Sequence, residues 1–123
     1  MITIKKIAVI SAITLSTLVM GSISIQAQPS PQNQIQNRIE LNRAKNLARM
    51  AAERENGGLG NYRAEASMHG VADNAPYLQN SDGSWTFTFK GRSPLSSVYS
   101  IESVITVLPD GSVTINYNGQ IRQ

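Results

Sequence analysis

The chain has 123 residues, with 11 lysines and arginines against 8 aspartates and glutamates, and a formal net charge of +3. This length fits one domain. The absence of cysteine excludes disulfides, thiolate metal sites and a cysteine nucleophile. The single histidine, His69, excludes any site that needs two imidazoles from one chain.

The first residues have the order of a secretory signal peptide. A short basic segment, Lys5 and Lys6, precedes the apolar run Ile7–Met20, and small residues follow up to Ala27. This order predicts a signal peptide over residues 1–27 that is cleaved after Ala27. An uncleaved membrane anchor is the alternative, because residues 7–25 are just long enough to span a bilayer.

Cleavage changes the charge of the protein. Without Lys5 and Lys6, nine basic residues remain against eight acidic ones, so the net charge falls close to zero. We therefore expect no nucleic-acid partner and no general attraction of the whole protein to anionic lipid. A signal peptide without cysteines further down the chain favours a periplasmic or extracellular bacterial protein over a disulfide-linked one.

The mature chain reads as a tether and then a helix. Residues 28–38 are rich in Gln, Asn and Pro, which predicts a polar tether. From residue 39 to Glu55 the apolar residues recur at helical spacing, and Asn56-Gly57-Gly58 is a typical helix stop. The apolar stripe of this helix consists of Leu41, Ala44, Leu47, Ala48, Ala51 and Ala52.

After residue 60 the period changes to two, which is typical of strands. We expect strands over residues 62–69 and 85–90, a long strand with Tyr99, Ile101, Ile105 and Val107 on one side, and a last strand with Val113, Ile115 and Tyr117 on one side. A further short strand at residues 77–78 is left open. Trp85, Phe87 and Phe89 should face the core. The predicted fold class is α+β: residues 39–123 form a single small domain, in which one N-terminal helix packs on a three- to four-stranded antiparallel meander sheet.

One side of the first predicted strand carries the candidate site. Arg63, Glu65, Ser67 and His69 alternate with Tyr62, Ala64, Ala66 and Met68, so they would share a polar face. This face is either an ordinary solvated surface or a small binding site centred on His69. A catalytic triad would need an acid from elsewhere, and no nucleophile-elbow motif is present. We predict no catalytic residue and no cofactor. We also predict no metal site, because the side chains of Met68 and His69, a possible pair of soft metal ligands, would point to opposite sides of a strand.

Several segments resemble short exported proteins of cyanobacteria. The resemblance lies in residues 43–49, 56–59, 62–65, 67–70, 85–89 and 101–104. It implies no activity and transfers no functional residue. The order of a helix and then a meander is also similar to cystatin-like and PepSY-like domains, but the Gln-x-Val-x-Gly loop of cystatins is absent, so protease inhibition is not expected.

These observations favour a small exported, non-catalytic domain that binds an unknown protein or small ligand or associates with the cell envelope. Membrane contact is expected only if the N-terminal segment stays uncleaved. The alternative is a small hydrolase or metal-dependent enzyme that uses His69. An acid and a hydroxyl within hydrogen-bond reach of His69, in a concave pocket, would favour the enzyme.

Overall fold

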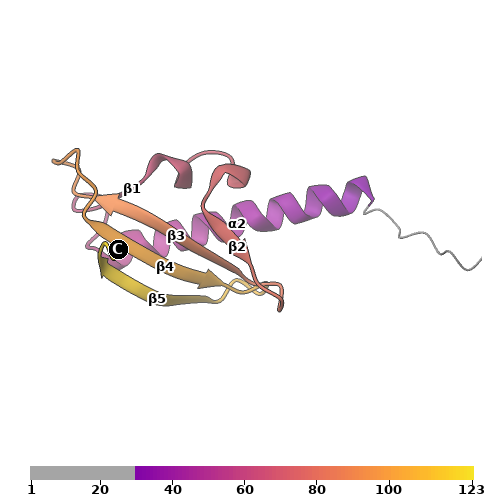
Figure 1. Cartoon of the computed structure of the whole chain (residues 1–123). Coiled ribbons are helices and arrows are strands. Elements are labelled where there is room, and N and C mark those ends of the chain that lie inside the picture. Colours follow the sequence, from indigo (N-terminus) through magenta and orange to yellow (C-terminus); the bar gives the residue numbers. More distant parts are fainter. Residues whose placement is uncertain (1–29) are drawn as a thin grey trace, which may run out of the picture.

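The computed structural model of this protein describes residues 30–123, so the predicted signal peptide lies outside the described part. One long helix crosses one face of a sheet and extends beyond it (Figure 1). This helix, α2, spans Pro31–Glu55. The α+β architecture predicted from the sequence is confirmed.

Helix α2 begins eight residues earlier than predicted, so residues 31–38 are helical and do not form a tether. The Ser30 hydroxyl caps the helix by accepting the Asn33 N–H at 3.2 Å, and Pro31 occupies the first helical position, where its missing N–H costs nothing. Adding turns to an existing helix needs no new nucleation. Residues 31–39 are all exposed, so their polar composition is that of a solvated helix.

The end of α2 and its buried face agree with the prediction. Gly57 and Gly58 adopt φ values of 94° and 91°, and the Gly58 N–H bonds the Glu53 carbonyl at 2.7 Å. The predicted stripe faces the sheet, with Leu47 half-buried and the other members buried. Lys45, which the apolar pattern leaves out, is also buried on this face.

The sheet has five antiparallel strands, one or two more than predicted. Its strands are β1 (Arg63–Ala64), β2 (Tyr77–Gln79), β3 (Trp85–Arg92), β4 (Ile101–Val107) and β5 (Val113–Gln120). The order is β1-β3-β4-β5, and β2 also pairs with β3. The two short strands lie along the same edge of β3: β1 pairs with its end, at residues 91–92, and β2 pairs with its start, at residues 85–87.

The predicted strand over residues 62–69 is wrong after Ala64. The chain leaves the sheet at Glu65, and Ala66–Met68 form a 3-10 turn, followed by a second one over Ala72–Asn74. Alternation of polar residues with small alanines is a weak strand signal, because alanine has little to pack on a pleated surface. Met68 is fully buried, as the pattern implied, but it reaches the core from a turn.

A β-bulge corrects the predicted face of the last strand. Ile115 pairs with Ile105, but the next pair along the two strands is Tyr117 with Val104, so Asn116 is an extra residue. The pleat therefore reverses, and Tyr117 lies on the outer face with Val104. Asn118 takes the inner position opposite Ser103.

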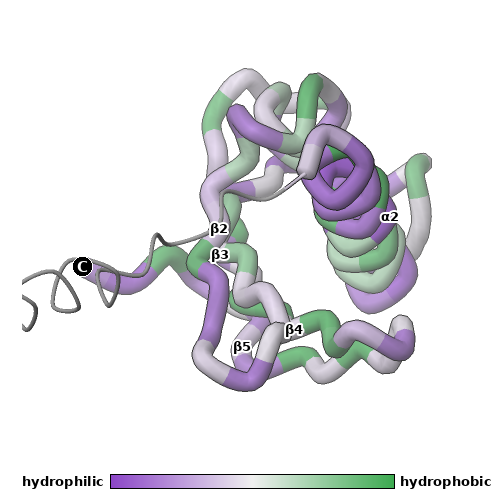
Figure 2. The backbone as a smooth tube through the Cα atoms, turned by 90° about the vertical axis from the view of Figure 1, so that its right-hand side faces the viewer, coloured by the Kyte–Doolittle hydropathy of each residue, from purple (hydrophilic) through white to green (hydrophobic). Residues whose placement is uncertain are grey.

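The core lies between α2 and the inner face of the sheet (Figure 2). Trp85, Phe87 and Phe89 are buried there, as predicted, and Ile105 and Val107 of β4 pack beside them. The predicted start of β4 is too early. Tyr99 precedes the strand and is 39% exposed, so it does not extend the core row.

Candidate functional site

The predicted polar face does not exist as one surface. Arg63 lies on β1 and is exposed, whereas Glu65, Ser67 and His69 follow in the turn segment. The carboxylate of Glu65 accepts the backbone N–H of Lys90 at 2.6 Å and the hydroxyl of Ser67 at 2.8 Å. Glu65 therefore attaches the first 3-10 turn to β3.

His69 has no catalytic geometry. It ends the first 3-10 turn, where its backbone N–H bonds the Ala66 carbonyl, and the residue is exposed. In the described part of the chain, no hydrogen bond or ion pair joins its imidazole to a carboxylate or a hydroxyl. The Ser67 hydroxyl donates to Glu65 instead. The structure thus brings Glu65 and Ser67 together and leaves His69 apart.

Two cations of α2 hold the segment between β1 and β2. The Lys45 ammonium donates to the Gly70 carbonyl, and the Arg49 guanidinium donates to the Met68 carbonyl at 3.0 Å. Lys45 is only 3% exposed. Burial lowers the pKa of this amine, and the nearby positive charge of Arg49 lowers it further. Both side chains act as fixed donors that position residues 65–75 against the helix.

A polar cluster lies between the end of α2 and the sheet. The side-chain amides of Asn56 and Asn118 bond each other reciprocally at 3.0 and 2.9 Å, and the Ser103 hydroxyl donates to Asn118 at 2.6 Å. The Tyr62 hydroxyl is buried nearby and has no hydrogen-bond partner among the described residues. Burial raises its pKa to about 12, although the neighbouring Ser103 hydroxyl opposes the shift. Asn56 and Asn118 are half-buried, and their side-chain amides are already paired with each other within the cluster.

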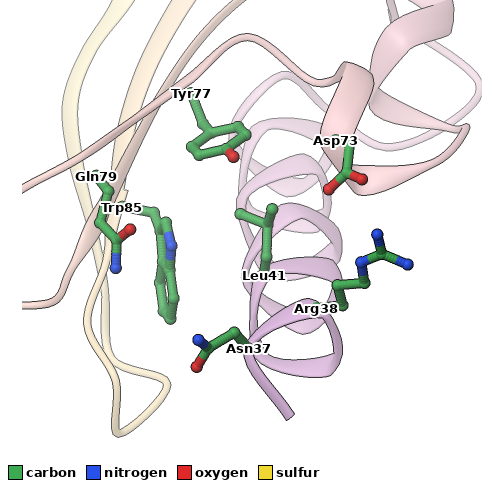
Figure 3. A pocket seen from close by; sticks show the side chains of 7 residues that line it. All are labelled: Asn37, Arg38, Leu41, Asp73, Tyr77, Gln79 and Trp85. Atoms are coloured by element: carbon green, nitrogen blue, oxygen red, sulfur yellow. The ribbon is translucent and has the colours of Figure 1, made fainter. Parts of the chain in front are cut away.

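A pocket of about 190 Å³ opens beside β2, at the N-terminal half of α2. Figure 3 shows its walls: the rings of Tyr77 and Trp85 come from the strands, and Leu41 comes from the helix. Tyr77 also packs on Phe87, with ring centroids 6.1 Å apart, which fixes its position. These three side chains form the apolar part of the pocket wall, and the contact with Phe87 ties Tyr77 to the core.

Polar groups surround these apolar walls. Asn37 and Arg38 reach the pocket from α2, Gln79 from β2, and Asp73 from the second 3-10 turn. Figure 3 shows the guanidinium of Arg38 and the carboxylate of Asp73 on the same side of the pocket. Two amides, one cation and one anion together supply donors and acceptors in several directions.

The lining chemistry is suited to binding. The seven lining residues include one carboxylic acid and no hydroxyl, thiol, amine or imidazole nucleophile other than the Tyr77 phenol. The Asp73 carboxyl and the Tyr77 phenol are the two lining groups of a kind that acid–base catalysis uses, and an arginine does not serve in this role. Within residues 30–123, no three His, Asp or Glu side chains gather as a metal site would require.

Sequence reasoning missed this pocket for a clear reason. Asn37 and Arg38 were assigned to a tether, and the three-residue strand β2 was only partly anticipated, so its Gln79 had no assigned neighbour. Trp85 was correctly placed in the core and is 9% exposed, but its ring also forms a pocket wall. The Ser30-Pro31 capping pair was the one local signal that would have extended the helix.

Comparisons of this chain with models of known protein families, with curated protein sequences and with solved structures find no significant match. The geometry of the pocket therefore carries the functional argument.

Proposed function

We propose that this protein is an exported, non-catalytic binding domain whose pocket between α2 and β2 takes a small polyhydroxylated ring, such as a terminal sugar residue. One observation carries this proposal. Two aromatic rings, of Tyr77 and Trp85, line the same small cavity as two side-chain amides, a guanidinium and a carboxylate. Ligand sites typically combine apolar and aromatic walls with a few polar groups that fix orientation.

Both sets of groups match the chemistry of a sugar. A sugar ring presents C–H groups on its faces, which pack on aromatic rings, and hydroxyls around its edge. Amide and carboxylate oxygens of Asn37, Gln79 and Asp73 accept hydrogen bonds from such hydroxyls, and the amide and guanidinium N–H groups donate to them. The cavity of about 190 Å³ is small, which favours a single ring as the group that enters it.

The helix cap supports the export part of the proposal. The predicted cleavage point after Ala27 precedes the capping residue Ser30 by three residues, so removal of residues 1–27 leaves the described fold complete. We expect the exported protein to have the mass of residues 28–123. A full-length mass in a membrane fraction would contradict cleavage.

The sole tryptophan provides the binding assay. Trp85 lines the pocket, so titration with glucose, galactose or N-acetylglucosamine should change its fluorescence for at least one of these probes. Asp73→Asn should weaken that binding about tenfold, since a hydrogen bond to a charged group contributes about 1.5–3 kcal/mol. Asn74→Ala, an exposed change next to it, should leave the affinity unaltered.

His69→Ala is the second control. It lies outside the pocket, so binding should persist in this variant. Loss of binding in His69→Ala with retention in Asp73→Asn would refute the pocket and return attention to the enzyme alternative. The absence of any fluorescence change with all three sugars would refute the proposed ligand class.

A further inference from the structure

We propose that the loop over residues 93–100, together with the basic side chains near its base, docks this protein onto an anionic lipid surface. The loop joins β3 to β4 and stands beyond the ends of these strands, at the end of the molecule where the C-terminus lies (Figure 1). Three of its side chains are apolar and open to water: Leu95 is 98% exposed, Val98 68% and Tyr99 39%. Exposed apolar groups that gather on one protruding segment typically mark an interaction surface.

The backbone of this loop is hydrogen-bonded by the protein itself. The Arg92 guanidinium donates to the carbonyls of Ser93 and Ser96, at 3.3 and 2.7 Å. The hydroxyls of the same two serines accept the N–H groups of Leu95 and Val98, at 3.2 and 3.0 Å. Dehydrating free backbone groups is the main cost that keeps loops out of an apolar phase. Because many of these groups already have partners, Leu95 and Val98 can leave water at a lower cost.

Positive charge surrounds the base of the loop. Arg63 pairs across the sheet with Arg92, Lys90 lies two residues before Arg92, and Arg54 lies in the last turn of α2. Among the ion pairs found within residues 30–123, none includes these four side chains. A lipid surface that carries anionic headgroups attracts such lysines and arginines.

Carboxylates at this end only partly offset the cations. The Glu102 carboxylate is paired with Arg122 at 3.1 Å, and Glu65 accepts the backbone N–H of Lys90, whereas Glu55 is exposed at the end of α2. Leu59, which is 60% exposed, adds a further apolar group in the connection from α2 to β1. Binding to a membrane interface requires both features: apolar side chains at the tip of the loop and basic side chains near its base.

The shape of this surface favours a lipid over a protein partner. A stable protein interface buries about 800 Å² on each side, with a packed apolar centre. Here the apolar groups sit on a narrow protruding loop. Five basic side chains at this end, Arg122 included, outnumber the three carboxylates, and Glu102 lies across the sheet from Lys90, so a net positive charge remains to complement an anionic headgroup layer. The loop also lies at the opposite end of the molecule from the start of α2 (Figure 1). Membrane contact therefore does not depend on the N-terminal segment or on the sugar pocket.

A single fluorescent label tests this proposal on the intact chain. Because the chain contains no cysteine, Leu95→Cys accepts one environment-sensitive fluorophore. Leu78→Cys is the matched control. Leu78 is also an exposed leucine, with 67% of its surface exposed, but it lies on β2, beside the start of β3. Vesicles of phosphatidylcholine with about one-third phosphatidylglycerol should shift the emission of the label at position 95 to the blue. The label at position 78 should not shift, and vesicles of phosphatidylcholine alone should have little effect.

Sedimentation with the same vesicles gives a second measurement. The double substitution of Leu95→Ser and Val98→Ser should reduce the membrane partition constant about tenfold, because two apolar groups no longer enter the interface. Leu78→Ser should bind like the unchanged protein. Equal blue shifts at positions 95 and 78, no shift with anionic vesicles, or unchanged binding of the double variant would each overturn the proposal.

Discussion

The contact between Gly91 and Tyr62 provides the sharpest test of the packing. Gly91 lies in β3, where it pairs with Ala64 on one side and Ile101 on the other. The ring of Tyr62 crosses directly over it: a Cβ added at Gly91 would lie 2.2 Å from Cε1, 2.4 Å from Cζ and 2.5 Å from the hydroxyl oxygen. Only glycine allows this approach.

The expected cost of Gly91→Ala follows from these distances. Ordinary carbon contacts are about 3.5–4.0 Å, so the Tyr62 ring would have to move by more than about 1 Å. The ring is fully buried, and Gly91 is held by hydrogen-bonded strands on both sides. Overpacking of a core costs about 1–3 kcal/mol, and we expect the upper end of this range. That is a large part of the about 5–15 kcal/mol that stabilises a typical domain.

Urea unfolding followed by the fluorescence of Trp85, the only tryptophan, measures this cost. Gly60→Ala is the matched control, because nothing lies within 4 Å of its added Cβ and its φ is not positive. This control should be unchanged or up to about 1 kcal/mol more stable.

A double-mutant cycle isolates the contact. Leucine at position 62 is too short to reach the space above residue 91, so Gly91→Ala should cost about 1–3 kcal/mol less in the Tyr62→Leu background. If Gly91→Ala has the same cost in both backgrounds, or is as harmless as Gly60→Ala, the proposed clash is wrong.

Two further predictions concern the core. Phe87→Ala should cost about 3–5 kcal/mol, because it removes a fully buried ring, whereas Thr88→Ala on the exposed side should cost under about 1 kcal/mol; equal urea midpoints would contradict the facing of β3. Folded Tyr62 keeps its proton up to a pKa of about 12, but the unfolded chain releases it near pH 10. The folded state therefore binds more protons in this window, and stability should fall by about 2 kcal/mol between about pH 10 and pH 12. A similar fall in Tyr62→Phe, measured by unfolding at both pH values, would show that another group is responsible.

Elements with large apolar side chains were predictable from local pattern. Trp85, Phe87 and Phe89 alternate with polar residues in the sequence, and all three are buried. The alanine stripe of α2 faces the sheet, as its helical spacing indicates. The end of helix α2 could be predicted from Gly57 and Gly58, because only glycine adopts their positive φ values without strain. In each case the residues themselves, through size or backbone freedom, decide the outcome.

Other features depend on contacts that are distant in sequence. The turn at residues 66–68 forms where the Glu65 carboxylate bonds the backbone of Lys90 and the cations of α2 bond the following carbonyls. The change of face at Asn116 depends on how β5 pairs with β4. The sequence alternates apolar and polar residues through this point, but the bulge shifts the following side chains to the opposite faces of the sheet. No short window contains this information.

The pocket depends on both kinds of feature at once. The alanines of α2 bring the helix close to the sheet, and that approach lets Lys45 and Arg49 reach the carbonyls of Gly70 and Met68. Those bonds place the turn that carries Asp73 on the same side of the pocket as Arg38. The remaining wall comes from the first turns of α2, which exist only because Ser30 and Pro31 begin the helix early. A ligand that contacts Asn37 and Asp73 together would therefore stabilise the exposed start of the helix, so binding and helix capping should be coupled.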